Sequence, residues 1–184
     1  DKPAKTTVQP YREILERLWV VDPIPAWLPT RNQLNRLAQT PKHQLADPAL
    51  AVRHLGMGEN ALIGGSEFGP AIPRDGTLLG HLFESLVSLC IRVFAQAAEV
   101  SVKHLRLHGG RREIDLIVER PDQCVVAIEV KLSAAINSDD VKNLLWLREQ
   151  IGEDLLDALV VNTGPNAYRR ADGIAVVPAA LLGP

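Results

Sequence analysis

The sequence predicts a mixed α/β domain that follows a smaller helical segment. From residue 77 onward, the apolar pattern changes from helix to strand and back, in the order α-β-β-β-α-β-β. The composition is 46% hydrophobic and 23% charged, which is typical of a globular protein with a substantial core. We therefore expect a helical segment over residues 1–56, a loop over 57–76 and the α/β domain over 77–184.

The first segment carries helix signals at both of its ends. Residues 8–20 place apolar side chains on one helical face, and three prolines between residues 23 and 29 then break any helix. Asp47 followed by Pro48 is a typical helix start, and Gly56 a typical stop. The stretch that follows is rich in glycine and predicts the loop.

The α/β part begins with the longest apolar run of the chain, residues 78–98. This run contains His81, Glu84 and Arg92, so we interpret it as a core helix and not as a membrane span. Two strands, 100–108 and 111–119, then flank a glycine pair, which is a hairpin signal.

Three further elements complete the predicted domain. Residues 124–133 form a third strand after a short turn. Residues 137–152 form an amphipathic helix that Asn137 or Ser138 would cap and Gly152 would end. Residues 155–164 are predicted to form a fourth strand, and residues 173–182 a short fifth strand that runs into a terminal turn.

Composition limits the possible functions and compartments. The formal net charge is −2, so global basicity does not indicate a nucleic-acid partner, although a local basic patch could. Cys90 and Cys124 lie in apolar runs, and a buried, reduced pair favours a cytoplasmic protein. No signal peptide is visible, no membrane is expected, and the start at Asp1 suggests a fragment with a module missing upstream.

Charged residues interrupt two of the most apolar strands. Glu129 and Lys131 lie two residues apart in the third strand, so both project from one face, about 6.5–7 Å apart. Antiparallel pairing across the preceding turn brings Asp115 near Glu129. We expect the neighbouring Glu113 to point to the opposite face, toward solvent.

Two carboxylates at close range repel each other unless a positive charge lies between them. Mg²⁺ or Mn²⁺ would supply that charge through oxygen ligands. Lys131 could then orient a water molecule and stabilise charge on a phosphate. The alternative is an edge-strand salt bridge between Glu129 and Lys131, with Asp115 as a strand-end cap.

The spacing of Asp115 and the run Glu129-Val130-Lys131 resembles the PD-(D/E)xK signature of restriction-endonuclease-like nucleases. The order α-β-β-β-α-β matches the core of that fold. Members often carry a further acidic residue on the helix before the first strand, and Glu84 stands in that place. Ile114, and not proline, precedes Asp115, which departs from the motif but leaves the acid intact.

Several segments resemble the C-terminal domain of uncharacterised bacterial and archaeal AAA-type ATPases, a domain of unknown function. These segments are "GHLFESLV", "GGRREIDLIVE", "AIEVKLS" and "VVNTG". In that group a winged-helix-like segment links the ATPase to the nuclease-like domain, and residues 1–56 are similar to it. No GxxxxGK[ST] phosphate-binding loop occurs in the sequence, so the resemblance implies an ATPase module upstream.

Basic residues of the predicted hairpin could follow a DNA or RNA backbone. They are Lys103, His104, Arg106, His108, Arg111 and Arg112. The alternative is a solvated hairpin tip. A second basic stretch could contact DNA or the upstream ATPase, and it consists of Arg31, Arg36, Lys42 and His43.

These observations lead to two hypotheses of different class. In the first, the chain is a metal-dependent nuclease: Asp115, Glu129 and Glu84 hold Mg²⁺ or Mn²⁺, the carbonyl of Val130 completes the site, and Lys131 positions the attacking water. In the second, it is a non-catalytic regulatory module of the ATPase that binds nucleic acid or protein.

Overall fold

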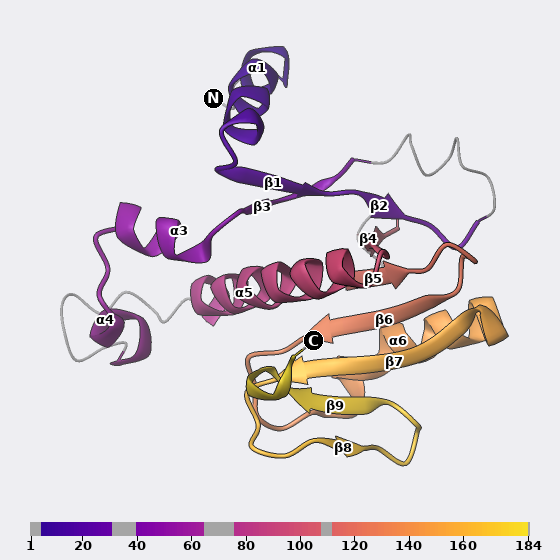
Figure 1. Ribbon diagram of the computed structural model, residues 1–184. Helices are drawn as coiled ribbons and strands as arrows, with labels where there is room; N and C mark the ends of the chain where they lie inside the picture. The colour runs from indigo at the N-terminus through magenta and orange to yellow at the C-terminus, as the bar shows by residue number, and fades with distance from the viewer. Residues whose placement is uncertain (1–4, 31–39, 65–75, 108–111, 184) are drawn as a thin grey trace.

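The structure is a computed structural model that describes residues 5–30, 40–64, 76–107 and 112–183 (Figure 1). The N-terminal segment mixes helices with short strands. Its elements are α1 (Lys5–Arg17), β1 (Val21–Ile24), β2 (Ala26–Trp27), β3 (Lys42–Leu45), α3 (Pro48–His54) and α4 (Glu59–Gly64).

The prediction of a helical N-terminal segment is therefore incomplete. Strands β1 and β3 pair with each other in antiparallel register, and strands of two to four residues are too short to show an alternating pattern. The expected loop over 57–76 contains the short helix α4. The expected start of α3 is confirmed, because Asp47 accepts a hydrogen bond from the backbone of Ala49 and Pro48 occupies the first turn.

The second half of the chain has the element order that the sequence predicts, with small additions. The elements are α5 (Gly76–Ala97), β4 (Ser101–Arg106), β5 (Glu113–Glu119), β6 (Val125–Val130), α6 (Ser138–Ile151), β7 (Leu155–Asn162), β8 (Tyr168–Arg169) and β9 (Ala175–Pro178). Two 3₁₀ turns, Gly152–Asp154 and Ala179–Leu181, follow α6 and β9. The two-residue strand β8 was not expected.

One mixed sheet of seven strands unites the two halves, in the order β2-β4-β5-β6-β7-β9-β8. Strands β4, β5 and β6 form an antiparallel meander, and α6 connects β6 to the parallel strand β7. At one edge, the N-terminal β2 runs parallel to β4. The sheet is thus built on a C-terminal framework to which the N-terminal segment contributes an edge strand.

Helices cover both faces of the sheet and create two hydrophobic clusters. On one face, Leu144 and Leu147 of α6 pack against strand residues such as Ile117 and Val160, all fully buried. On the other face, Val87 of α5 belongs to the second cluster. This three-layer arrangement forces charged groups within β5 and β6 into a buried setting.

Local sequence signals explain why α6 begins and ends where it does. The side chain of Asn137 accepts hydrogen bonds from the backbone of Asp139 and Asp140, and the Asp140 carboxylate in turn accepts one from the backbone N–H of Asn137. Gly152 ends the helix with a φ of 54°, a conformation that favours glycine. The capped helix then delivers the chain to β7 on the far side of β6.

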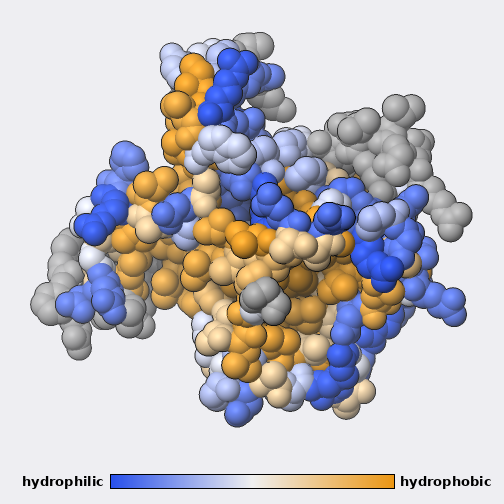
Figure 2. Space-filling model, viewed as in Figure 1, coloured by the Kyte–Doolittle hydropathy of each residue, from blue (hydrophilic) through white to orange (hydrophobic). Residues whose placement is uncertain are grey.

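Within the described residues, one helix is long and apolar enough to cross a bilayer by length and composition alone, over Leu78–Ala97 of α5. Its Arg92 forms an ion pair with Asp22 at 2.5 Å, and its Val87 is buried against the sheet. Exposed apolar side chains gather on its outer face and along one side of α1 (Figure 2). They include Leu86, Leu89 and Val93 on α5, and Tyr11, Ile14 and Leu18 on or next to α1.

Candidate functional site

Asp115 and Glu129 lie at the same end of the antiparallel pair β5–β6. The last paired residues on this side are Leu116 and Ile128. Beyond them, the backbone N–H of Val130 donates to Oδ2 of Asp115 at 2.9 Å, and the N–H of Lys131 donates to the carbonyl of Val161 at 2.9 Å. The two strands therefore separate at this point, and the Asp115 side chain fills the opening.

Glu129 is the most deeply buried carboxylate of this group, with 4% of its surface exposed. The ammonium of Lys131 lies 3.4 Å from its Oε2. Burial raises the pKa of Glu129, the nearby charge of Asp115 raises it further, and Lys131 only partly opposes them, so that the pKa reaches about 8. Burial lowers the pKa of Lys131, but Glu129 and Asp115 more than offset this and leave it above its usual value.

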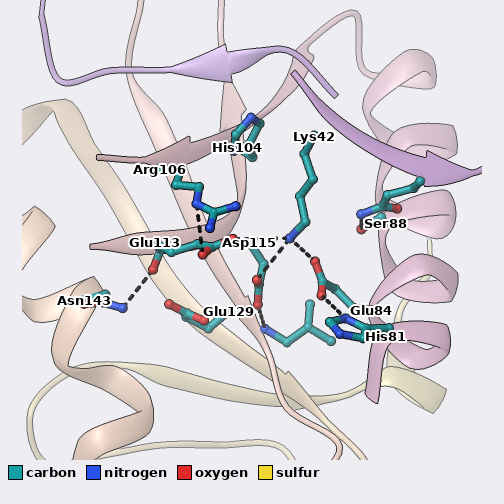
Figure 3. A network of polar contacts seen from close by, with 12 residues as sticks. Lys42, His81, Glu84, Ser88, His104, Arg106, Glu113, Asp115, Glu129 and Asn143 are labelled. Atoms are coloured by element: carbon teal, nitrogen blue, oxygen red, sulfur yellow. Dashed lines mark hydrogen bonds and ion pairs between the residues drawn. The ribbon is translucent and has the colours of Figure 1, made fainter. Parts of the chain in front are cut away.

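Glu84 approaches the same place from α5, as the resemblance implied. It does not stand alone there, because the side chain of Lys42 reaches in from β3 and contacts Glu84 directly. The Lys42 ammonium also lies 3.7 Å from Oδ1 of Asp115. Figure 3 shows Asp115 with Glu129 on one side and with Lys42 and Glu84 on the other. A lysine ammonium is thus the cation between two of the three predicted carboxylates.

The structure contradicts two expectations about charged side chains near the site. Lys42 does not extend outward as part of a basic surface; its side chain is only 25% exposed and lies among carboxylates. Glu113 does not face away from Asp115, because its Oε1 lies 3.8 Å from the same ammonium. Residues 113 and 115 are two apart in a strand and share a face, so strict alternation should have placed them together.

The basic residues predicted to contact nucleic acid divide into two groups. Arg106 and Arg112 lie at the same end of the sheet as the carboxylates: Arg106 approaches Glu113 at 3.7 Å, and Arg112 stacks on Trp146, 5.4 Å from the ring centre. Lys103 lies toward the opposite end of β4 and bonds to the buried Glu119. Arg111, like Arg31 and Arg36, lies outside the described residues.

His104, one of the hairpin residues expected to follow a nucleic-acid backbone, is instead buried beside the site. Its Nε2 lies 3.4 Å from the carbonyl of Thr40, two residues before Lys42. Burial lowers the pKa of His104, so the ring is neutral at pH 7 and donates a hydrogen bond from Nε2. The ring thereby helps to anchor the backbone that carries Lys42.

The donor set has the chemistry of a site for a hard divalent cation, although the present arrangement accommodates an ammonium. Carboxylate oxygens from Asp115, Glu129 and Glu84 are the ligands that Mg²⁺ and Mn²⁺ prefer. With Lys42 among them, no group of three or more histidine, cysteine, aspartate or glutamate side chains in the described part of the chain converges to hold a metal ion. The contact between Lys42, Glu84 and Asp115 shows that this position accepts positive charge.

Two families match the chain in separate regions. The family described as "Domain of unknown function (DUF4143)" matches residues 79–182, which is more than half of the chain. The family described as "Domain of unknown function (DUF8612)" matches residues 2–61. No curated protein and no solved structure matches. The carboxylates of the site thus come from the first region, and Lys42 comes from the second.

Proposed function

Since the chain belongs to the DUF4143 family of domains of unknown function, whose description names no activity, we propose a function from the site itself. The chain is a PD-(D/E)xK nuclease-like domain that hydrolyses phosphodiester bonds with the help of Mg²⁺ or Mn²⁺. The observation that carries this proposal is the buried Glu129, held beside Asp115, with Lys131 two residues further along the chain, directly after the end of β6.

Stability alone gives little reason for such a cluster. Burying a charged group costs free energy unless good partners compensate, and well-packed apolar residues commonly serve a core at least as well. Glu129 lies on β6, two residues after the buried Ala127 and opposite the buried Val160 of β7. A catalytic or metal-binding role therefore explains a carboxylate pair in this setting better than a contribution to stability does.

The fold and the position of Glu84 support the same proposal. From α5 to β7 the element order is α-β-β-β-α-β, with the charged residues at one end of β5 and β6. Glu84 on α5 reaches the carboxylates through a shared cation. The resemblance to AAA-type ATPases extends the proposal to an ATPase module as partner, with the DUF8612 region between the two.

In this mechanism, Asp115, Glu129 and Glu84 would hold the divalent cation, which would supply Lewis-acid stabilisation of the scissile phosphate. The chain's own residues perform the remaining tasks. The Lys131 ammonium, 34% exposed at the side chain, orients the attacking water and stabilises the negative charge that develops on the phosphate. Arg106 and Arg112 contact phosphates of the DNA or RNA on either side of the reacting bond.

The first experiment is a calorimetric titration of Mn²⁺ and Mg²⁺ into the wild type, Glu129→Gln and the control Glu149→Gln, whose side chain is exposed on α6. Saturable binding should be present in the wild type and the control and lost in Glu129→Gln. Cleavage of labelled single- and double-stranded DNA and RNA should follow the same pattern. Lys131→Met should keep the metal and lose at least about 100-fold in rate. Full cleavage by Glu129→Gln refutes the proposal.

A second candidate function is a non-catalytic nucleic-acid- or protein-binding regulatory module of the ATPase. It is favoured by one observation, namely that the Lys42 ammonium contacts Glu84 and lies 3.7 Å from Asp115, so that this lysine neutralises both carboxylates. In that case the cluster is an ion-pair network that fixes the N-terminal segment to the α/β domain. It predicts no saturable binding of Mn²⁺, no cleavage, and an affinity for nucleic acid that Glu129→Gln leaves unchanged.

A further inference from the structure

Strand β3 docks on α5 in a way that aims Lys42 at the carboxylates. Lys42 contacts Glu84, and Gln44, two residues further, donates a hydrogen bond to Ser88 at 3.1 Å. Two residues of a strand advance about 6.7 Å, and four residues of a helix advance about 6 Å. Because the two spacings match, the strand contacts the helix at both points. The docking of β3 on α5 therefore fixes the position of Lys42.

Contacts on the other sides of Lys42 reinforce this placement. His43 faces α1, where its Nε2 lies 3.1 Å from Oε1 of Glu16. The carbonyl of Thr40 approaches His104 of β4. The segment from Thr40 to Gln44 is therefore attached to α1, β4 and α5, and a flexible surface lysine that happened to reach the cluster would lack these attachments.

The Lys42 ammonium occupies oxygens that the proposed function assigns to the metal. It contacts Glu84 and lies 3.7 Å from Oδ1 of Asp115 and 3.8 Å from Oε1 of Glu113. A divalent cation binds carboxylate oxygens at about 2.0–2.2 Å and repels an ammonium held within a few ångströms. The two cations therefore exclude each other from this position.

We propose that Lys42 is a built-in competitor for the divalent cation, through which the N-terminal segment keeps the nuclease-like site closed to metal. This inference rests on the proposed function. Metal enters only when the Lys42 ammonium leaves, so metal binding and the binding of this ammonium to the carboxylates oppose each other by the same factor. Any event that draws β3 away from α5, such as movement of an attached module, would open the site to metal.

The structure offers space for the displaced side chain. A cleft of about 250 Å³ runs beside it between β3 and α5. Residues of both elements line this cleft, including Lys42, Leu45, Leu82 and Ser85. Rotation of the lysine stem alone could move the ammonium toward this cleft while the backbone of β3 stays paired with β1.

The test compares Mn²⁺ affinity, measured by calorimetry, among the wild type, Lys42→Met, Lys42→Arg and the control Lys142→Met. Lys142 is an exposed α6 lysine with a 3.7 Å contact to Asp139. Lys42→Met removes the competing charge and should bind Mn²⁺ at least about fivefold more tightly than the wild type, within the usual range of coupling between sites. Lys42→Arg keeps the charge and should not gain affinity, and Lys142→Met should match the wild type.

The outcomes separate this inference from the proposed function. Equal or weaker Mn²⁺ binding by Lys42→Met overturns the competition and leaves the metal site standing. No saturable Mn²⁺ binding by any of the four proteins, each with a native circular dichroism spectrum, overturns both. Tighter binding by Lys42→Met that Lys42→Arg does not reproduce supports both.

A measurement on the wild type keeps the inference testable if Lys42→Met fails to fold. Trace acetylation followed by mass spectrometry reports the accessibility of each amine, with Lys142 as the exposed internal reference. Saturating Mn²⁺ should raise the acetylation of Lys42 relative to that of Lys142, because the metal displaces the ammonium into solvent. An unchanged or lower ratio overturns the competition.

Discussion

The stability of the metal-free protein should carry a pH signature that comes from Glu129. Replacing Glu129 with glutamine removes the titrating group but keeps its shape and its resemblance to the protonated acid. The pKa of Glu129 rises from 4.5 to about 8 in the fold, chiefly through burial and then through the charge of Asp115. Between these two values the folded state binds one proton more than the unfolded state.

The sign and size of the effect follow from linkage. An acid whose pKa is raised by folding contributes stability that is fully present below the unfolded value and is lost as the pH rises through the folded value. One extra proton changes the free energy of unfolding by about 1.4 kcal/mol per pH unit. Over the window from 4.5 to about 8, the upper limit is roughly 5 kcal/mol. This is a large part of the 5–15 kcal/mol that a domain typically has.

The assay is urea unfolding at pH 5, 6.5 and 8 in the presence of a chelator, on the wild type and Glu129→Gln. The two proteins should have similar free energies of unfolding at pH 5. As the pH approaches 8, the free energy of unfolding of the wild type should drop below that of Glu129→Gln by several kcal/mol, because only the wild type must ionise a buried group. A difference that stays constant with pH, or that changes in favour of the wild type, would refute the reasoning.

Three further predictions concern the parts of the fold that position the site. Asn137→Ala removes the capping box of α6 and should lower the free energy of unfolding by about 0.5–2 kcal/mol in urea, and an unchanged midpoint would contradict the role of the cap. Leu144→Ala opens a cavity in the fully buried cluster under α6 and should cost about 2–5 kcal/mol in the same assay, so a loss below about 1 kcal/mol would argue against this packing. Trp27→Phe removes the indole N–H that donates to Oε1 of Glu119 at 2.9 Å and should cost about 1–3 kcal/mol in thermal unfolding, whereas a neutral effect would mean that the bond stabilises little.

The sequence alone predicted the elements with strong local signals. The capping residue and the terminal glycine of α6 both lie where the pattern placed them, as do β5 and β6. The predicted third strand ends at Val130, before Lys131, but the charged groups of Glu129 and Lys131 still lie 3.4 Å apart, as the spacing of two residues predicted. These features depend on residues close together in the chain, for which backbone geometry suffices.

The features that were missed depend on contacts between distant segments. Lys42 and Glu84 are 42 positions apart, and no local pattern indicates that β3 docks on α5. Glu113 is a different case, because its position two residues before Asp115 was enough to place it on the site's face. The basic hairpin residues were grouped by sequence alone, and the pairing of Lys103 with Glu119 depends on the register between β4 and β5.

The strand pairing of β2 with β4 has a consequence for dissecting the chain. Within the described residues, both outermost strands of the large sheet, β2 and β8, are only two residues long, and short edge strands discourage aggregation through strand addition. Cutting the chain just before α5 would remove β2 and expose the six-residue strand β4 as a new edge. The excised DUF4143 region should therefore be prone to self-association. A piece that keeps the chain from α1 onward retains β2 and should self-associate less.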